Sequence, residues 1–205
     1  MTKPIDPGIK VIMKPSIFNE EQELLKAIID LHSTNGIELD PMYFKGNFYK
    51  QILDPRLKFD INPQSLGVEK ADAQHLPIDD GSISCMVLDP PFMFGNHGTQ
   101  KSYYSSKTHG IFKSFGELEK LYKEILCEAK RVLKKGGVLF FKCQDYTDSK
   151  TTMTHCLVWS WATDIGFYAK DLAILHLIKN KVWNSNLQQK HLRKVHSYFW
   201  VFVKQ

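Results

Sequence analysis

The sequence predicts an α/β fold in a single domain that spans residues 1–205. Its 205 residues, 43% of them hydrophobic and 24% charged, are enough for one complete core and are ordinary for a globular protein. Short apolar runs typical of strands alternate with stretches of helical periodicity. Four of the predicted strands end in an aspartate: Asp40, Asp60, Asp72 and Asp89. Because strands of such a sheet line one crevice with their carboxyl ends, we expect these carboxylates along a single edge.

The composition indicates in which cellular compartment the protein acts. No apolar run approaches the roughly 20 residues that a membrane-spanning helix needs. The N-terminus has no apolar stretch behind Lys3, so we expect no secretory signal. The four cysteines form no Cys-x-x-Cys pair, and three of them lie within apolar runs. Buried free thiols are typical of a reducing compartment, so we predict a cytoplasmic protein without a membrane partner.

The first part of the chain is predicted to hold an arm, a helix and four strands. Three prolines make residues 1–16 an N-terminal arm. Residues 16–19 open a helix with acids in its first turn and an apolar face, and Asn35-Gly36 ends it. Strands are expected at 37–40, 57–60, 68–72 and 82–88.

The second part is predicted to continue the alternation of helices and strands. Ser114 and Glu117 match a capping box, and the amphipathic helix behind them is closed by two lysines and two glycines. Further elements are expected in this order: a strand at 138–144, a helix at 149–164, a strand at 167–178 and a strand at 198–203. The last two strands are expected to pair as a hairpin.

The stretch Asp89-Pro90-Pro91-Phe92 holds three chemical groups in fixed relation at the end of a buried strand. Two prolines remove both N–H donors, so the strand stops there, and they push Asp89 into an extended conformation. The Asp89 carboxylate and the Pro90 carbonyl can accept hydrogen bonds from an exocyclic amine while Phe92 stacks on the ring that bears it. An ordinary strand-ending turn is the structural alternative.

This stretch resembles the [Asp/Asn/Ser]-Pro-Pro-[Tyr/Phe/Trp] motif of the S-adenosylmethionine (SAM)-dependent amino-methyltransferases. Those enzymes modify adenine N6, cytosine N4 and some guanine or protein amides. The resemblance implies a Rossmann-like class I methyltransferase domain, with a seven-stranded, mostly parallel sheet and a C-terminal antiparallel hairpin. It also implies SAM as cofactor and a catalytic role for Asp89, Pro90, Pro91 and Phe92.

The resemblance extends to the cofactor side. Asp40 and Pro41 followed by Gly46 resemble the family's first SAM-binding loop, usually Asp-Pro-x-x-Gly-x-Gly, although only one glycine is present. Asp60 lies 20 residues after Asp40, an interval that suits hydrogen bonds to ribose hydroxyls. An acid, a small residue and Leu-Pro resemble the loop that binds the SAM adenine, which assigns this role to Asp72 and Ala73. The alternative for each acid is a turn or a helix cap.

Two segments without acids flank the candidate site in a chain of net charge +5, and they suggest a polyanionic partner. They are an active-site loop at 93–113 and a basic segment at 179–196. The candidate nucleic-acid-binding residues are Lys101, Tyr103, Tyr104, Lys107, Lys190, Arg193 and Lys194. Solvated loops, with the tyrosines packing the first loop down, are the alternative. His97 and His109 lack a metal-ligand pattern, so we expect no metal site.

The favoured function is methyl transfer from SAM to adenine N6 in DNA, because Asp before Pro-Pro is common in the adenine enzymes of the family and Ser in the cytosine enzymes. An RNA base remains open as the target. So does a nucleic-acid-binding module that has lost SAM binding, or an enzyme of protein amides or small molecules. The sequence does not decide the oligomeric state.

Overall fold

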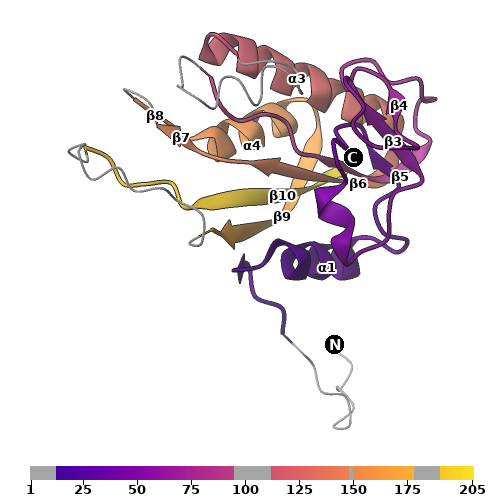
Figure 1. Cartoon of the computed structure of the whole chain (residues 1–205), viewed down its shortest axis with the longest axis horizontal. Helices are drawn as coiled ribbons and strands as arrows, with labels where there is room; N and C mark the ends of the chain where they lie inside the picture. The colour runs from indigo at the N-terminus through magenta and orange to yellow at the C-terminus, as the bar shows by residue number, and fades with distance from the viewer. Residues whose placement is uncertain (1–12, 95–111, 148–149, 178–189) are drawn as a thin grey trace, which may run out of the picture.

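A computed structural model describes residues 13–94, 112–147, 150–177 and 190–205 (Figure 1). The helical elements are α1 (Glu21–His32), the 3-10 helix η1 (Asn47–Lys50), α3 (Phe115–Val132) and α4 (Thr154–Asp164). The main-sheet strands are β1 (Ile17–Phe18), β2 (Leu39–Asp40), β3 (Leu57–Asp60), β4 (Glu69–Lys70), β5 (Ile83–Leu88), β6 (Leu133–Cys143), β9 (Phe167–His176) and β10 (His196–Lys204). A small separate hairpin joins β7 (Tyr146–Thr147) to β8 (Thr151–Thr152).

The main sheet confirms the predicted α/β class and is mostly parallel. Its strand order is β1-β9-β10-β6-β5-β2-β3-β4, and β10 is antiparallel to both of its neighbours. The C-terminal antiparallel hairpin is therefore also confirmed. The sheet has eight strands, however, so the expected count of seven was wrong. The additional strand, β1, pairs Ile17 and Phe18 with β9 and buries Phe18. A strand of two residues shows no alternating pattern, so the sequence predicts this stretch as the start of a helix.

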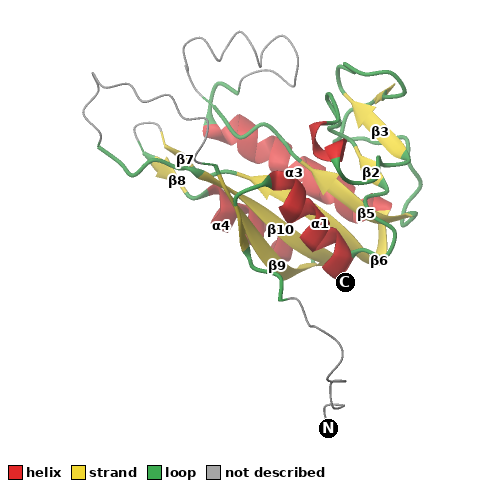
Figure 2. Cartoon of the chain, turned by 60° about the horizontal axis from the view of Figure 1, so that its bottom comes forward, coloured by secondary structure: helices red, strands yellow, loops and turns green. Residues whose placement is uncertain are grey.

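Helices cover the sheet on both faces. Figures 1 and 2 show α1 on one face and α3 with α4 on the other. Side chains of β6 alternate between the two cores, as a strand's period of two requires. Leu139 and Phe141 belong to the core under α3 and α4, whereas Val138 and Phe140 belong to the core over α1. The sheet is thus buried on both sides, which explains its nearly continuous apolar strands.

Several element boundaries differ from those expected. Strands β2 and β4 are shorter than predicted, and β4 ends at Lys70, so Asp72 follows this strand and does not end it. The predicted cap of α3 is present, because Ser114 Oγ accepts a hydrogen bond from Glu117 N at 3.4 Å. The helix ends at Val132, and the two lysines and two glycines after it already lie in β6. Helix α4 begins at Thr154, because the β7-β8 hairpin takes up the residues before it. None of the helices that the structure describes is both long enough and apolar enough to cross a bilayer.

Candidate active site

The predicted aspartates meet at the carboxyl edge of the sheet. Strands β5, β2, β3 and β4 are adjacent and mutually parallel, so the residues at their carboxyl ends lie along one edge. Asp40 is only 3% exposed; its carboxylate accepts hydrogen bonds from Met42 N at 2.9 Å and from the Tyr49 hydroxyl at 2.7 Å. Burial raises the pKa of Asp40 to about 7, these two donors oppose the rise, and the charges of Asp89 and Asp60 add to it. Asp89 and Asp60 therefore lie close enough to Asp40 for their charges to affect its ionisation.

Asp89 forms an ion pair that the sequence analysis missed. Its Oδ2 accepts a hydrogen bond from Lys142 Nζ at 3.1 Å, and the same ammonium group donates to Glu21 Oε1 at 2.9 Å. Lys142 comes from β6 and Glu21 from the first turn of α1. The ammonium also lies 4.8 Å from the ring centroid of Phe48 and 5.6 Å from that of Phe199. Two carboxylates and two aromatic rings thus enclose one cation.

The charges of this cluster set the protonation of its members. Burial raises the pKa of Asp89, the charge and hydrogen bond of Lys142 oppose that rise, and Glu21 adds to it. Burial by itself would lower the pKa of Lys142, but the carboxylates of Asp89 and Glu21 raise it above its ordinary value. Lys142 is therefore charged at neutral pH. It favours the ionised form of Asp89, the form that only accepts hydrogen bonds.

The Pro-Pro turn is anchored from the helix side. Pro90 is buried, and the Pro91 carbonyl accepts a hydrogen bond at 3.0 Å from the hydroxyl of Tyr122, a fully buried residue of α3. The half-buried Phe92 ring makes no aromatic contact with another residue of the described ranges. The buried Pro90 and the Tyr122 hydrogen bond therefore fix the turn between Asp89 and Phe92.

The entrance and exit of the predicted active-site loop lie together. Phe94 and Phe112 form a parallel β-bridge, so the two ends of the segment between them meet beside the Pro-Pro turn. The Phe94 ring packs against Phe115 at 5.6 Å and against Tyr146 at 4.7 Å between ring centroids. The candidate residues Lys101, Tyr103, Tyr104 and Lys107, together with His97 and His109, lie outside the described residues.

The loop after β2 is filled by its own aromatic side chains. Gly46 has φ +68°, and a Cβ built there would lie 2.4 Å from the Tyr43 hydroxyl oxygen. Tyr43 stacks on Tyr49 at 5.3 Å and donates a hydrogen bond to Asp54 at 2.6 Å. The glycine is therefore required by Tyr43, so its presence does not by itself indicate a cofactor. Pro41, which precedes the loop, is buried.

Asp60 closes the same loop from β3. Its Oδ2 accepts a hydrogen bond from the Phe44 amide at 2.8 Å, and its Oδ1 accepts one from the Asn62 amide at 2.8 Å. Phe44 has φ +49°, a left-handed conformation that costs energy for a residue with a side chain. Asp60 helps to hold this conformation. Each carboxylate oxygen can accept a second hydrogen bond, so the predicted contact with ribose hydroxyls is chemically open.

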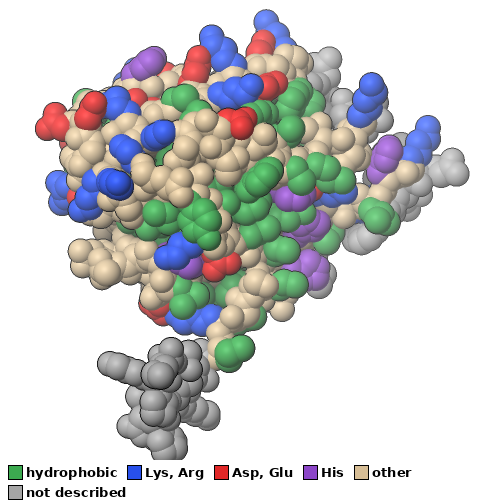
Figure 3. Space-filling model, turned by 180° about the vertical axis from the view of Figure 1, so that it is seen from behind, with side chains coloured by type: hydrophobic (Ala, Val, Ile, Leu, Met, Phe, Trp, Pro, Cys, Tyr) green, Lys and Arg blue, Asp and Glu red, His purple; other side chains and the backbone are tan. Residues whose placement is uncertain are grey.

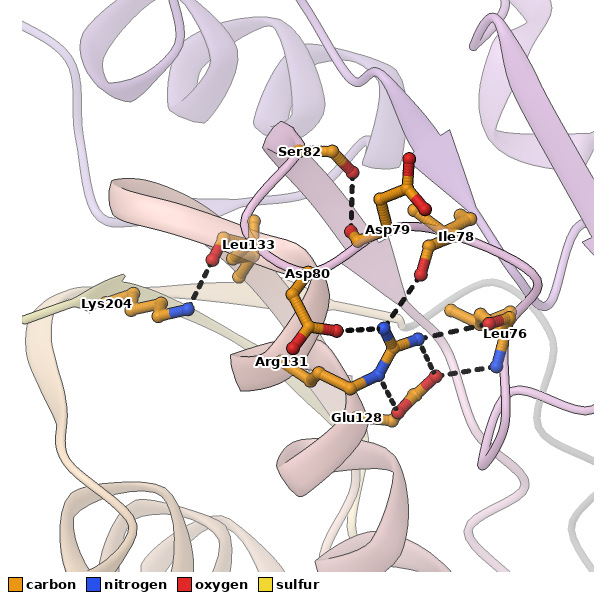
Figure 4. Close-up of polar contacts among 9 residues, drawn as sticks. All are labelled: Leu76, Ile78, Asp79, Asp80, Ser82, Glu128, Arg131, Leu133 and Lys204. Carbon is orange, nitrogen blue, oxygen red and sulfur yellow. Dashed lines mark hydrogen bonds and ion pairs between the residues drawn. The ribbon is translucent and has the colours of Figure 1, made fainter.

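The predicted adenine-binding loop is anchored to α3. Asp72 accepts hydrogen bonds from the Gln74 amide and side chain, whereas the Ala73 side chain is buried in the core. Figure 4 shows the anchor: the Arg131 guanidinium donates to the carbonyl oxygens just after this loop and to two carboxylates. Its acceptors are Leu76 O at 3.0 Å, Ile78 O at 2.8 Å, Asp80 at 2.5 Å and Glu128 at 2.7 Å. Arg131 therefore fixes the path of residues 76–80 against the helix.

The described part of the basic segment lies at the same edge as Asp89. Lys190 and Arg193 are exposed and Lys194 is half-buried, directly before β10. Because β10 is antiparallel to β6, its first residues lie beside the carboxyl end of β6; Tyr198 pairs with Cys143 there. Figure 3 shows basic and histidine side chains together near this end of the molecule, beside the grey atoms on the right.

The hydrogen-bond acceptors at this edge fit SAM. SAM carries two cationic groups, ribose hydroxyls and an adenine amine, and carboxylates are suitable partners for all of them. Asp40, Asp60, Asp72 and Asp89 supply such carboxylates along one edge. The glycine loop departs from the expected pattern, since Tyr43 occupies the space beside Gly46. Among the described residues, no group of three His, Cys, Asp or Glu side chains could hold a metal ion.

The chain is similar to solved methyltransferase structures. A SAM-dependent methyltransferase from Methanosarcina mazei has 15% identity and a TM-score of 0.50, over 86% of this chain and 96% of that one. TrmN from Thermus thermophilus has 17% identity and a TM-score of 0.50, over 90% of this chain and 49% of that one. A putative DNA modification methylase, also from Thermus thermophilus and complexed with S-adenosyl-L-methionine, has 14% identity and a TM-score of 0.48, over 72% of this chain and 53% of that one.

The chain spans about half the length of the putative DNA modification methylase from Thermus thermophilus, 53% of which is covered. No curated protein sequence compared with the chain gives a match. The model of the N6/N4 methyltransferase family, described as DNA methylase, matches residues 83–205. The match covers more than half of the chain and begins at β5, the strand that Asp89 follows directly. The chain therefore belongs to the N6/N4 DNA methylase family, a family of methyltransferases whose cofactor is SAM.

Proposed function

We propose that this protein transfers a methyl group from SAM to an exocyclic amine of a nucleobase, with adenine N6 in DNA as the favoured target. One observation carries the proposal: the Asp89 carboxylate stands at the carboxyl end of β5, one-third exposed, in a turn that Tyr122 anchors and three positions before the half-buried Phe92. Such a group can accept a hydrogen bond from an amine that Phe92 holds by stacking.

The residues of the turn have distinct parts in the proposed reaction. Bound SAM supplies the methyl group. An amine conjugated to an aromatic ring is a poor nucleophile, and hydrogen bonds to Asp89 and to the Pro90 carbonyl draw its nitrogen toward tetrahedral geometry. The Asp89 charge stabilises the positive charge that develops on this nitrogen. Phe92 contributes about 1–3 kcal/mol of stacking free energy. Proton loss follows methyl transfer, so Asp89 need not be a strong base.

Lys142 positions Asp89. Its ammonium group binds one carboxylate oxygen, Oδ2, which leaves Oδ1 for the amine. A base in duplex DNA must leave the stack before it can reach these groups. Residues of the basic segment, at the same edge, would bind the phosphates; Lys190, Arg193 and Lys194 are the described candidates. The described ends of the active-site loop, Phe94 and Phe112, form a bridge beside the turn.

Two observations favour adenine in DNA over the other exocyclic amines. Asp in front of Pro-Pro favours adenine over cytosine, and family membership favours DNA over RNA. The free thiols of all four cysteines favour the cytoplasm as the place of action.

Transfer of label from SAM tests the proposal. The protein is incubated with SAM labelled in its methyl group and with unmodified DNA, RNA or protein, and Asp89→Ala is the control. We expect label in DNA with the wild type and none with Asp89→Ala, whose melting temperature should match the wild type within a few degrees. Label in RNA alone would make an RNA base the substrate in place of a DNA base. Label in protein alone, or equal labelling by the wild type and Asp89→Ala, would refute the proposal.

A module that binds nucleic acid without methyl transfer is the second candidate, and one observation favours it. Tyr43 occupies the space beside Gly46 that the first SAM-binding loop of the family leaves open. Calorimetric titration with SAM separates the two candidates. Binding with a dissociation constant below about 1 mM, a gain of about 4 kcal/mol, supports the enzyme. No heat at millimolar SAM, together with salt-dependent DNA binding, supports the module.

A further inference from the structure

A second cluster of reactive side chains lies where the chain passes from β6 to α4. The Cys156 thiol sulfur is 3.3 Å from Nε2 of His155, and Nδ1 of the same ring is 2.7 Å from Oδ1 of Asp145. Cys156 is exposed, the His155 side chain is 21% exposed and Asp145 is only 4% exposed. A sulfur, an imidazole and a buried carboxylate thus form one hydrogen-bonded line from the surface inward.

Neighbouring groups fix the orientation of the imidazole. Asp145 also accepts hydrogen bonds from the His155 amide at 3.2 Å and from the Tyr198 hydroxyl at 3.3 Å. The Tyr198 ring stacks on the imidazole with centroids 4.1 Å apart and planes 15° apart. The Trp200 indole donates to the His155 carbonyl at 3.1 Å. These contacts fix the backbone of His155, one face of its ring and Nδ1. The remaining ring nitrogen, Nε2, faces the sulfur of Cys156.

The carboxylate decides which nitrogen carries the proton. An ionised Asp145 can only accept hydrogen bonds, so Nδ1 of His155 is the donor of their 2.7 Å contact. In the neutral imidazole Nε2 is then an acceptor, and it faces the thiol of Cys156. A nucleophile, a base within reach of its proton and a third group that orients the base are the signature of an activated nucleophile.

We propose that Cys156 is a nucleophilic thiol and a modification site for small electrophiles, of which hydroperoxides are the natural class. The thiol proton passes to Nε2 of His155, and the sulfur attacks one peroxide oxygen. The S–O bond forms while the O–O bond breaks, and the leaving hydroxide or alkoxide takes the proton from His155. The products are Cys156 sulfenic acid and water or an alcohol; the sulfur is oxidised and the peroxide reduced.

The other three cysteines provide internal controls. Cys127 is exposed on α3 and, among the contacts of the described residues, has no imidazole beside it. Cys85 and Cys143 are buried. Burial raises the pKa of the Cys85 thiol to about 12 and that of Cys143 well above its ordinary value. Within the part of the chain that the structure describes, Cys156 alone combines exposure with a neighbouring base.

The cluster adjoins the candidate active site. Asp145 follows β6 at the carboxyl edge of the sheet, three positions after Lys142. The charges of both Asp89 and Asp145 add to the effect of burial on the Cys143 thiol, so this residue lies within electrostatic reach of both sites. The reactivity of Cys156 does not depend on methyl transfer.

Alkylation kinetics test the proposal. The folded full chain is treated with iodoacetamide at pH 7, and peptide mass spectrometry gives the rate at Cys156 and at Cys127 in the same sample. An unassisted thiol is about 3% ionised at this pH, so proton transfer to His155 can raise the rate by up to about 30-fold. We expect Cys156 to react about 10-fold faster than Cys127. In His155→Gln this ratio should fall to about 1, with the rate at Cys127 unchanged.

A second measurement uses hydrogen peroxide followed by dimedone, which traps sulfenic acid. We expect the trapped adduct at Cys156 in the wild type, much less of it in His155→Gln and none at Cys127. Equal alkylation of the two exposed thiols in the wild type, or a fast Cys156 that His155→Gln leaves unaffected, would overturn the proposal. Cys85 and Cys143 in each sample report whether a variant is still folded, because unfolding would expose these two buried thiols to the reagent.

Discussion

Replacing Lys142 with methionine removes the cation between Glu21 and Asp89 and keeps a side chain of similar length. The Lys142 side chain is 17% exposed, and those of Glu21 and Asp89 are 27% and 33% exposed. Breaking a fully buried pair costs about 3–5 kcal/mol; solvent screens these partly exposed carboxylates, so we expect about 2–3 kcal/mol. For a chain of this length that loss lowers the melting temperature by about 5–10 °C.

The free energy of unfolding should also depend on pH differently in the wild type and in Lys142→Met. Because the folded-state pKa of Lys142 is raised, its stabilisation is complete below pH about 10.4 and is lost as pH rises through the folded value. The variant should lack this alkaline decline. Without Lys142, the pKa of Asp89 should rise further above its ordinary value. The variant's free energy of unfolding should therefore fall as pH rises from about 4 toward neutrality.

Thermal and urea unfolding followed by circular dichroism measure both effects. Lys120→Met is the matched control, since Lys120 pairs with Glu124 at 3.8 Å on the surface of α3, with 76% and 41% of the side chains exposed. We expect this control to cost less than about 0.5 kcal/mol. If Lys142→Met costs no more than Lys120→Met, the cluster around Lys142 contributes nothing and the reasoning is refuted.

Three further changes test the surroundings of the site by the same unfolding measurements. Gly46→Ala should cost about 1 kcal/mol more than Gly36→Ala, because both glycines have positive φ but only the first would press a Cβ against Tyr43; equal costs would contradict the packing of this loop. Arg131→Met should cost about 2 kcal/mol, since it removes the cation beside the buried Glu128 carboxylate and the side-chain donor to the Ile78 carbonyl, whereas Glu128 and the Leu76 carbonyl keep backbone donors; a neutral effect would mean that the loop needs no anchor. Ser114→Ala should cost about 1 kcal/mol through loss of the N-cap of α3, and an unchanged midpoint would argue against that cap.

The edge of the sheet could be predicted because its signal is local. Asp40, Asp60 and Asp89 each follow an apolar run directly, and the carboxyl ends of parallel strands must meet. Strand β1 could not be predicted in the same way. Its two residues, Ile17 and Phe18, carry no periodicity, and their pairing with β9 joins segments far apart in the chain.

Local sequence patterns could not predict the ion-pair cluster around Asp89. Lys142 and Glu21 are 121 positions apart, and nothing near either residue indicates the other. The only sequence signal was a lysine near the end of an otherwise apolar strand. Tyr122 is a similar case, because in the sequence it is one more residue on the apolar face of α3, and only the fold brings its hydroxyl to the Pro91 carbonyl.

Identification of the methylated nucleoside tests the central claim most directly. DNA incubated with the protein and SAM is digested to nucleosides, which are separated and weighed by mass spectrometry, with Asp89→Ala in parallel. We predict that N6-methyldeoxyadenosine appears with the wild type and is absent with Asp89→Ala. DNA nucleosides that stay unmodified, or a methyl group on a ring atom in place of an exocyclic amine, would contradict the assignment of Asp89 as the group that binds the amine.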